Sequence, residues 1–280
     1  MIMLEQLKTT WGSEKNNEPE IQQRIWDRVA KDYGELPIPS FEDNDFLGKL
    51  SASIALCRSH RTLDIGCGSG VYSMALAPFV GEAVGVDISP NMIEYATKRS
   101  RELGLDSTNF QRIDWSAADI DALGFRGTFD VVFAHMTPAI CNYETFDKMN
   151  ACSRNLCMMQ KPTRRKNQVM DEAFRRVGIE RSEAQYHGDI WQAFTFLWYK
   201  GYCPQFFYHD EVWDSKKSVE DMVAWCTDRA LLQKKLTEKE QAVIRSYVES
   251  LAVDGMVQEH TITTRVTVIW NVNEKKRKLQ

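Results

Sequence analysis

The 280-residue sequence predicts an α/β fold, in which a mostly parallel sheet carries helices on both faces. Three observations support this prediction. Short apolar strands alternate with helical segments between residues 61 and 177. Several of these strands end in an acidic residue or in glycines, and hydrophobic residues make up 43% of the chain, enough for a sizeable core. Such alternation is typical of right-handed βαβ units.

We predict seven strands, of which the first five alternate with helices. The strands are expected at residues 61–65, 83–87, 108–113, 129–134, 155–160, 205–209 and 261–271. Helices are expected near residues 70–79, 90–103, 143–153, 168–177 and 189–202. The second of these helices has a clear start, because Ser89 can cap it and Pro90 suits its first position.

Further helical segments flank this alternation. Residues 1–18 are polar and are expected to be frayed, whereas a helix from Pro19 has one apolar face. Together with the following turn it predicts an N-terminal helical cap or lid, residues 1–48, before a main domain, residues 49–280. Capping signals at Ser218 and Thr237 predict a helical insertion at about 214–256, before the last strand.

Composition narrows the classes of function. Lys and Arg number 35 against 39 Asp and Glu, a net charge of −4, which argues against a nucleic acid as the main partner. Seven cysteines without a CxxC pair indicate reduced thiols, a cytoplasmic location and no metal site. The sequence has no secretory signal and no apolar run of membrane-spanning length, so we expect no membrane partner. The oligomeric state is not revealed.

The most informative segment lies where the first strand ends and the next helix begins, and it reads LDIGCGSG at residues 63–70. Glycines let such a turn adopt positive φ and let a ligand approach the backbone closely. The spacing is GxGxG, and Val71 stands where the dinucleotide-binding pattern has its third Gly or Ala. Asp64 precedes the first glycine by two positions, and a carboxylate there suits an ammonium group better than a pyrophosphate.

Three later strands end in groups that suit the same ligand. Asp87 ends the second strand, where its carboxylate can accept both hydroxyls of a ribose. Asp114 and Trp115 follow the third strand and suit the amino group and ring face of an adenine. His135 directly follows the fourth strand. Because ligands of open α/β sheets sit beyond the carboxyl ends of the strands, we expect these groups to meet at one site.

On these residues the chain resembles the class I S-adenosylmethionine (SAM)-dependent methyltransferases. The resemblance rests on LDIGCGSG at 63–70, VGVDISPNMIEYA at 84–96, the Asp114-Trp115 pair and FDVVFAH at 129–135. It is strong over residues 49–160. It implies a Rossmann-like seven-stranded sheet, SAM as the cofactor, and transfer of a methyl group to a small-molecule acceptor with release of S-adenosylhomocysteine.

The resemblance also implies roles for single residues. The methionine part of SAM would be lined by the glycine turn and the acid before it, namely Asp64, Gly66, Cys67, Gly68 and Gly70. Asp87 would hold the ribose, and Ile88, Asp114 and Trp115 would contact the adenine. Ala134 and His135 would lie near the sulfonium, and Trp26 and Tyr33 would belong to a lid over the cofactor.

His135 is the candidate general base, since it follows the fourth strand and histidine titrates near neutral pH. His209, after a later strand, is a second candidate. A base is needed only if the acceptor arrives protonated, because methyl transfer depends mainly on holding donor and acceptor in line. The sequence does not identify the accepting atom.

Two other functions are open on the sequence alone. One is an NAD(P)-dependent oxidoreductase, against which both Asp64 and Val71 count. The other is a protein that binds SAM without catalysis, as a sensor or scaffold.

A titration separates the first of these alternatives. We expect SAM, and not NADH, to change the fluorescence of the chain's eight tryptophans in a saturable way, because the acidic residue before the turn repels a pyrophosphate. Saturable binding of NADH with no response to SAM would favour the oxidoreductase.

Overall fold

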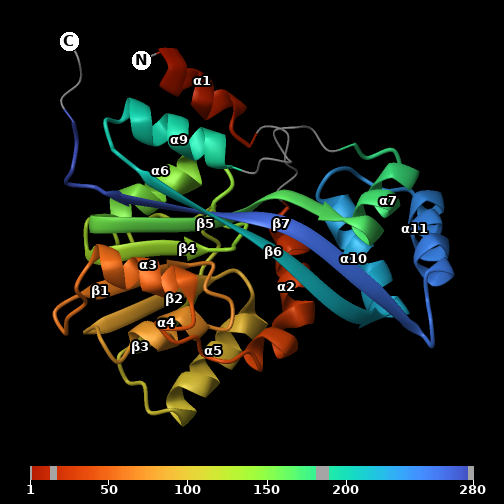
Figure 1. Cartoon of the computed structure of the whole chain (residues 1–280), viewed down its shortest axis with the longest axis horizontal. Coiled ribbons are helices and arrows are strands. Elements are labelled where there is room, and N and C mark those ends of the chain that lie inside the picture. The colour runs from red at the N-terminus through yellow and green to blue at the C-terminus, as the bar shows by residue number, and fades with distance from the viewer. Residues whose placement is uncertain (1, 13–17, 181–188, 277–280) are drawn as a thin grey trace.

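The computed structural model describes residues 2–12, 18–180 and 189–276. Its strands form a seven-stranded sheet in the order β3-β2-β1-β4-β5-β7-β6 (Figure 1). Neighbouring strands from β3 to β5 are parallel, and β7 runs antiparallel to both β5 and β6. The predicted mostly parallel, seven-stranded α/β fold is therefore confirmed. The strands are β1 (Arg61–Ile65), β2 (Glu82–Asp87), β3 (Thr108–Arg112), β4 (Phe129–His135), β5 (Ser153–Asn167), β6 (Gln205–Ser218) and β7 (Met256–Asn271).

Helices cover both faces of this sheet. One core, between the sheet and α1, α6 and α9, contains Phe146, Phe196 and Trp270, whereas α3 and α4 enclose a second core around Phe46 and Phe133. Burial on both faces is what parallel strands require. The helices are α1 (Ile2–Thr10), α2 (Pro19–Gly34), α3 (Asp45–Ser53), α4 (Val71–Leu76), α5 (Pro90–Glu102), α6 (Tyr143–Cys152), α7 (Gln168–Arg176), α9 (Ile190–Tyr199), α10 (Val219–Leu231) and α11 (Glu238–Ser250).

The expectation that the first eighteen residues are frayed was wrong for the part the structure describes. Residues 2–10 form α1, which packs along α9 (Figure 1). The helix is anchored by Leu7 and Trp11, which are buried in the core on the α6 side. The Trp11 ring lies 5.3 Å from that of Phe146, and its Nε1 donates to Asp189. Two apolar side chains in a polar segment thus hold a short helix through tertiary contacts.

The last three strands are longer than predicted and carry an extension of the sheet (Figure 1). The helices α7, α10 and α11 pack on this extension around their own apolar core. The predicted insertion at 214–256 needs correction, because β6 continues to Ser218 and its helices span 219–250. Both predicted caps are present, since the side chains of Ser218 and Thr237 accept from backbone amides three residues on. The polar sequence of 209–218 hid the strand, because this edge strand is largely exposed.

Helix α2 connects the helix that follows β2 with the helices that pack on the sheet extension. It packs on α5 at one side and on α10 at the other. Asp27 of α2 accepts from Ser89 Oγ at 2.5 Å, and on the other side Asp228 of α10 accepts from Arg24 at 2.7 Å and lies 3.3 Å from Arg28. This placement suits a lid. The lid role and the division at residue 48, which falls inside α3, stay predictions.

None of the helices in the described residues has the length and apolar character that crossing a membrane requires.

Replacing Asp228 by alanine should loosen α2 from α10 and leave the sheet intact. The change removes a buried carboxylate that two arginines share. Both arginines are partly exposed and can regain water, so we expect a loss of only about 1–2 kcal/mol. Trypsin should then cut α2 faster than in the unaltered chain, as mass spectrometry of the fragments would show.

The matched control is Glu172→Ala, which removes a partly exposed carboxylate shared by two arginines on α7. It should leave cleavage of α2 unchanged. Equal protection of α2 in the Asp228→Ala variant and the unaltered chain would contradict the bridging role of this helix.

Candidate functional site

The glycine turn between β1 and α4 is shaped by close contacts as well as by its backbone. Gly66 and Gly70 have φ of 69° and 75°, in the left-handed region that favours glycine. A Cβ at Gly66 would lie 2.0 Å from Thr137 Oγ1, and one at Gly70 would lie 2.5 Å from the Phe110 ring. Neither position admits a side chain. The turn is therefore pressed between the loop after β4 and the side chain of β3.

Asp87, at the end of β2, joins this turn to the start of α5. Its Oδ2 accepts from the Gly68 amide and its Oδ1 from the Ser89 amide, each at 2.9 Å. The side chain is 8% exposed, and burial raises its pKa. Each carboxylate oxygen can accept a further hydrogen bond, so the group keeps the capacity to hold two hydroxyls. Ile88 follows directly and is partly buried.

Asp64 lies beneath the turn and is 2% exposed. Ser73 Oγ of α4 donates to its Oδ2 at 3.0 Å. Burial raises the pKa of this carboxyl to about 8, and the negative charge of Asp87 adds to the effect. Two buried acids side by side favour a cationic ligand, because a positive charge would stabilise both carboxylates. SAM, which carries an ammonium and a sulfonium group, fits this arrangement.

The cysteines add no reactive group to the site. Cys67 in the turn is buried, and burial raises its pKa well above the ordinary range, which keeps the thiol protonated and unreactive. Cys152 is likewise buried, with a pKa of about 12. Among residues 2–12, 18–180 and 189–276, no group of three or more His, Cys, Asp or Glu residues could hold a metal ion.

The two residues after β3 are placed differently from one another. Asp114 is partly buried, and its Oδ1 accepts from the amide and hydroxyl of Ser116. Trp115 is 3% exposed, and its Nε1 donates to the carbonyl of Thr145 on α6 at 3.0 Å. The expectation that its ring face meets adenine needs correction, because the ring is turned into the core. Only the Trp115 backbone is left for a ligand contact.

The end of β4 places its two candidate residues on opposite faces of the sheet. The Ala134 side chain is buried in the core on the α6 side. The His135 ring lies between those of Phe46 and Tyr72, with centroid distances of 4.7 and 4.0 Å. Burial lowers the pKa of His135 to about 3, and the charge of Arg265 adds to this.

His135 therefore does not titrate near neutral pH as expected from its residue type. Its imidazole is neutral at physiological pH, and its Nε2 is buried with no hydrogen-bond partner among the described residues. A ring with so low a pKa is a weak base. The second candidate, His209, is exposed on the edge strand β6.

The lid candidates lie on α2, Trp26 near its middle and Tyr33 near its C-terminal end. The Tyr33 ring is 39% exposed and meets the Trp26 ring edge-on at 5.9 Å. The carbonyl of Tyr33 accepts from Ser69 Oγ, inside the glycine turn, at 2.6 Å. The lid candidate is thus connected to the turn through its backbone, while its side chain is available at the surface.

The structure brings Asp64, the glycine turn and Asp87 together, and it adds residues that sequence reasoning missed. Ser73 binds Asp64, and Thr137 packs on Gly66. Ser73 lies on the first turn of the helix that follows the glycines, a position that could have drawn attention to it. No local pattern singles out Thr137, because its contact exists only once β1 and β4 are neighbours.

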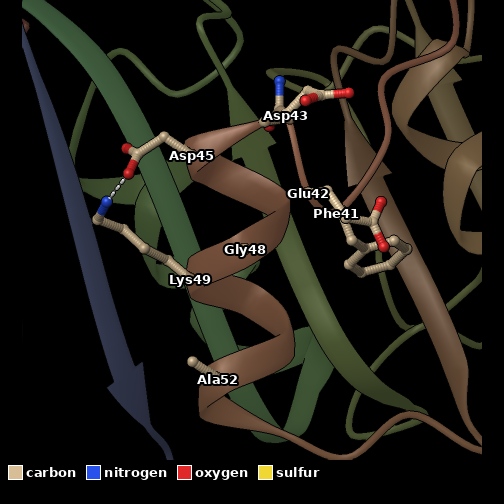
Figure 2. Close-up of a pocket in the computed structure, with 8 residues that line it drawn as sticks. Phe41, Glu42, Asp43, Asp45, Gly48, Lys49 and Ala52 are labelled. Carbon is tan, nitrogen blue, oxygen red and sulfur yellow. Dashed lines mark hydrogen bonds and ion pairs between the residues drawn. The ribbon is translucent and has the colours of Figure 1, made fainter.

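A shallow hollow on the outer side of α3 lies apart from these groups (Figure 2). Residues 41–45 line it together with Gly48, Lys49 and Ala52. Two of its four charged side chains, Asp45 and Lys49, pair with each other one helical turn apart. None of the lining residues belongs to the glycine turn or to a strand end, so we assign no ligand to it.

Known sequences match part of this chain. Residues 58–185 match a family model described as a methyltransferase domain. The uncharacterised methyltransferase YcgJ of Bacillus subtilis is 40% identical over 73 residues, which are 26% of this chain and 28% of that protein. Mouse glycine N-methyltransferase is 36% identical over 87 residues, which are 28% of this chain and 29% of that enzyme. The chain thus spans less than a third of the length of these two relatives.

Known structures share the fold over most of the chain. The crystal structure of YcgJ from Bacillus subtilis has a TM-score of 0.50 at 15% identity and covers 82% of this chain and 98% of that one. Phosphoethanolamine N-methyltransferase 2 of Haemonchus contortus has a TM-score of 0.53 at 15% identity, covering 89% of this chain and 60% of that one. At such identities the likeness shows the fold.

The raised pKa of Asp64 predicts that binding of a cationic ligand releases a proton. Below about pH 8 the carboxyl is largely protonated, and a nearby ammonium group would lower its pKa and drive the proton off. Affinity for SAM should therefore rise as the pH increases toward about 8. Calorimetry in buffers of different ionisation enthalpy would detect the released proton.

The matched control for this measurement is Asp64→Asn, which keeps the shape of the side chain. It should bind more weakly and release no proton at this position. Identical proton release by the variant and the unaltered chain would rule out Asp64 as the source.

Proposed function

We propose that this chain, whose residues 58–185 match a methyltransferase family model, is a class I SAM-dependent methyltransferase that transfers a methyl group from SAM to a small-molecule acceptor and releases S-adenosylhomocysteine. The family match supports the resemblance that the sequence indicated. The observation that carries the proposal is the glycine turn, with Asp64 buried beneath it and Asp87 bonded to its middle amide.

The relatives support methyl transfer and differ in what they methylate. By their names, mouse glycine N-methyltransferase and the ubiquinone biosynthesis O-methyltransferase of Burkholderia cenocepacia act on small molecules. An enzyme of Shewanella piezotolerans, 31% identical over 105 residues, is named for a uracil of 23S rRNA. The net charge of −4 favours the small molecule here, because an RNA acceptor requires clustered positive charge.

The residues of the turn would bind and orient the cofactor. SAM supplies a methyl group that is activated by positive sulfur. Asp64 lies where a carboxylate would hold the ammonium group, and Asp87 where one would hold the ribose. Helix α2 lies beside both the turn and α5 and would exclude water. Holding the two reactants in line can contribute up to about 10 kcal/mol to the rate in the best cases.

The neutral His135 favours an acceptor that arrives with a free lone pair. An imidazole whose pKa is about 3 can accept a hydrogen bond but does not readily remove a proton. His135 is therefore not proposed as a strong base, and its ring, held between Phe46 and Tyr72, would shape the end of β4 beside the acceptor. Methyl transfer by positioning alone is consistent with this role.

We propose a cytoplasmic location for the protein from its cysteine content. The chain has seven cysteines and no CxxC pair, a pattern that suits a reducing compartment such as the cytoplasm.

Incubation with methyl-labelled SAM and an extract of small cytosolic metabolites tests the proposed activity. We expect a labelled product and S-adenosylhomocysteine in equal amounts, identified by mass spectrometry. Asp87→Ala is the matched control, and it should bind SAM more weakly by about tenfold or more because hydrogen bonds to a charged group are lost. Firm SAM binding with no S-adenosylhomocysteine from any acceptor mixture would instead support the non-catalytic sensor.

A further inference from the structure

Two lysines on the α6 side of the sheet donate to the backbone of the two loops at the candidate site. Lys148 lies on α6 and reaches the loop after β3, and Lys161 lies on β5 and reaches the loop after β4. Neither lysine stands in a motif that sequence reasoning singled out. Their partners are backbone carbonyl oxygens, so the lysines act on the path of each loop.

Lys148 binds three backbone carbonyls of the loop that follows β3. Its Nζ donates to the carbonyls of Trp115, Ser116 and Ala118 at 2.6, 3.0 and 3.2 Å. Burial lowers the pKa of this lysine, while the charge of Asp114 opposes the shift. The ammonium group thus closes the loop whose first residue, Asp114, is a proposed adenine contact.

Lys161 does the same for the loop that follows β4. Its Nζ donates to the carbonyls of Thr137 and Ile140 at 2.6 Å each and lies 3.5 Å from Asp189 Oδ2. The preceding residue, Gln160, accepts from the Met136 amide at 3.0 Å. Consecutive residues of β5 therefore hold both ends of this loop.

Lys161 is buried, and its charged side chain is compensated by the groups that it binds. The residue is 5% exposed, and a lysine is rarely so buried unless its charge is compensated. The loop that it holds carries Thr137, which lies against Gly66 with no room for a side chain between them. The position of the Thr137 backbone therefore determines the width of the space beside the glycine turn.

We propose that Lys148 and Lys161 are positioning residues, which fix the adenine end and the methionine end of the cofactor site separately. This inference rests on the proposed function, because it assumes that SAM occupies the turn. Each lysine acts through backbone carbonyls and touches no part of the cofactor itself. The two should therefore affect different fragments of the same ligand.

Calorimetric binding of S-adenosylhomocysteine and of adenosine to Lys148→Met and Lys161→Met tests this division. We expect Lys148→Met to weaken both ligands by about tenfold, because both carry the adenine. Lys161→Met should weaken S-adenosylhomocysteine by about tenfold and leave adenosine within about twofold. A purely structural role of Lys161 would lower the affinity for both ligands together in Lys161→Met.

Two controls separate positioning from stability. Lys200→Met removes a lysine that pairs with Asp147 and contacts neither loop, so both affinities should stay unchanged. Asp189→Asn removes the charge partner of Lys161 and keeps its bonds to the loop, so it should lower the melting temperature and leave the affinities within about twofold. If Lys161→Met does not fold, Lys161→Gln replaces it, with the same ligand preference expected.

The outcomes distinguish this inference from the function on which it rests. If the unaltered chain binds neither ligand, the proposed function and the inference both fail. If the unaltered chain binds both ligands, two results would show that the positioning roles alone are wrong. In one, Lys161→Met loses affinity for adenosine as strongly as for S-adenosylhomocysteine. In the other, neither variant loses affinity for either ligand.

Discussion

The hydrogen bond from the Gly68 amide to Asp87 is the contact on which the rest of the site depends. It joins the ends of two neighbouring parallel strands, β1 and β2, at one carboxylate. The same carboxylate also accepts from Ser89, whose hydroxyl caps α5 and binds Asp27 of α2. A single buried acid therefore connects the glycine turn, the helix that follows β2 and the candidate lid.

The cost of burying negative charge explains why this site suits a cation. Asp64 and Asp87 are both buried at the carboxyl end of the sheet, and burial raises the pKa of each. A positively charged ligand would lower both pKa values and stabilise the folded chain by mass action. On the opposite side of the same site, lysine ammonium groups bind loop carbonyls, so their charge is directed at the backbone.

Much of this arrangement could be predicted because it is encoded locally. The strand ends, the glycine spacing and the caps at Ser89, Ser218 and Thr237 are all signals within a few residues. The parts that were missed depend on contacts distant in sequence. Trp115 has an indole ring that could stack on an adenine, yet this ring is held in the core by a hydrogen bond to a carbonyl of α6. Residue type alone could not reveal this.

The structure of the chain in complex with S-adenosylhomocysteine would show whether Asp87 and the glycine turn bind the cofactor. We expect the sugar hydroxyls within hydrogen-bonding distance of Asp87 and the amino acid portion along residues 66–70, above Asp64. A ligand bound elsewhere, or a turn that is still filled by neighbouring side chains in the presence of saturating ligand, would contradict this expectation.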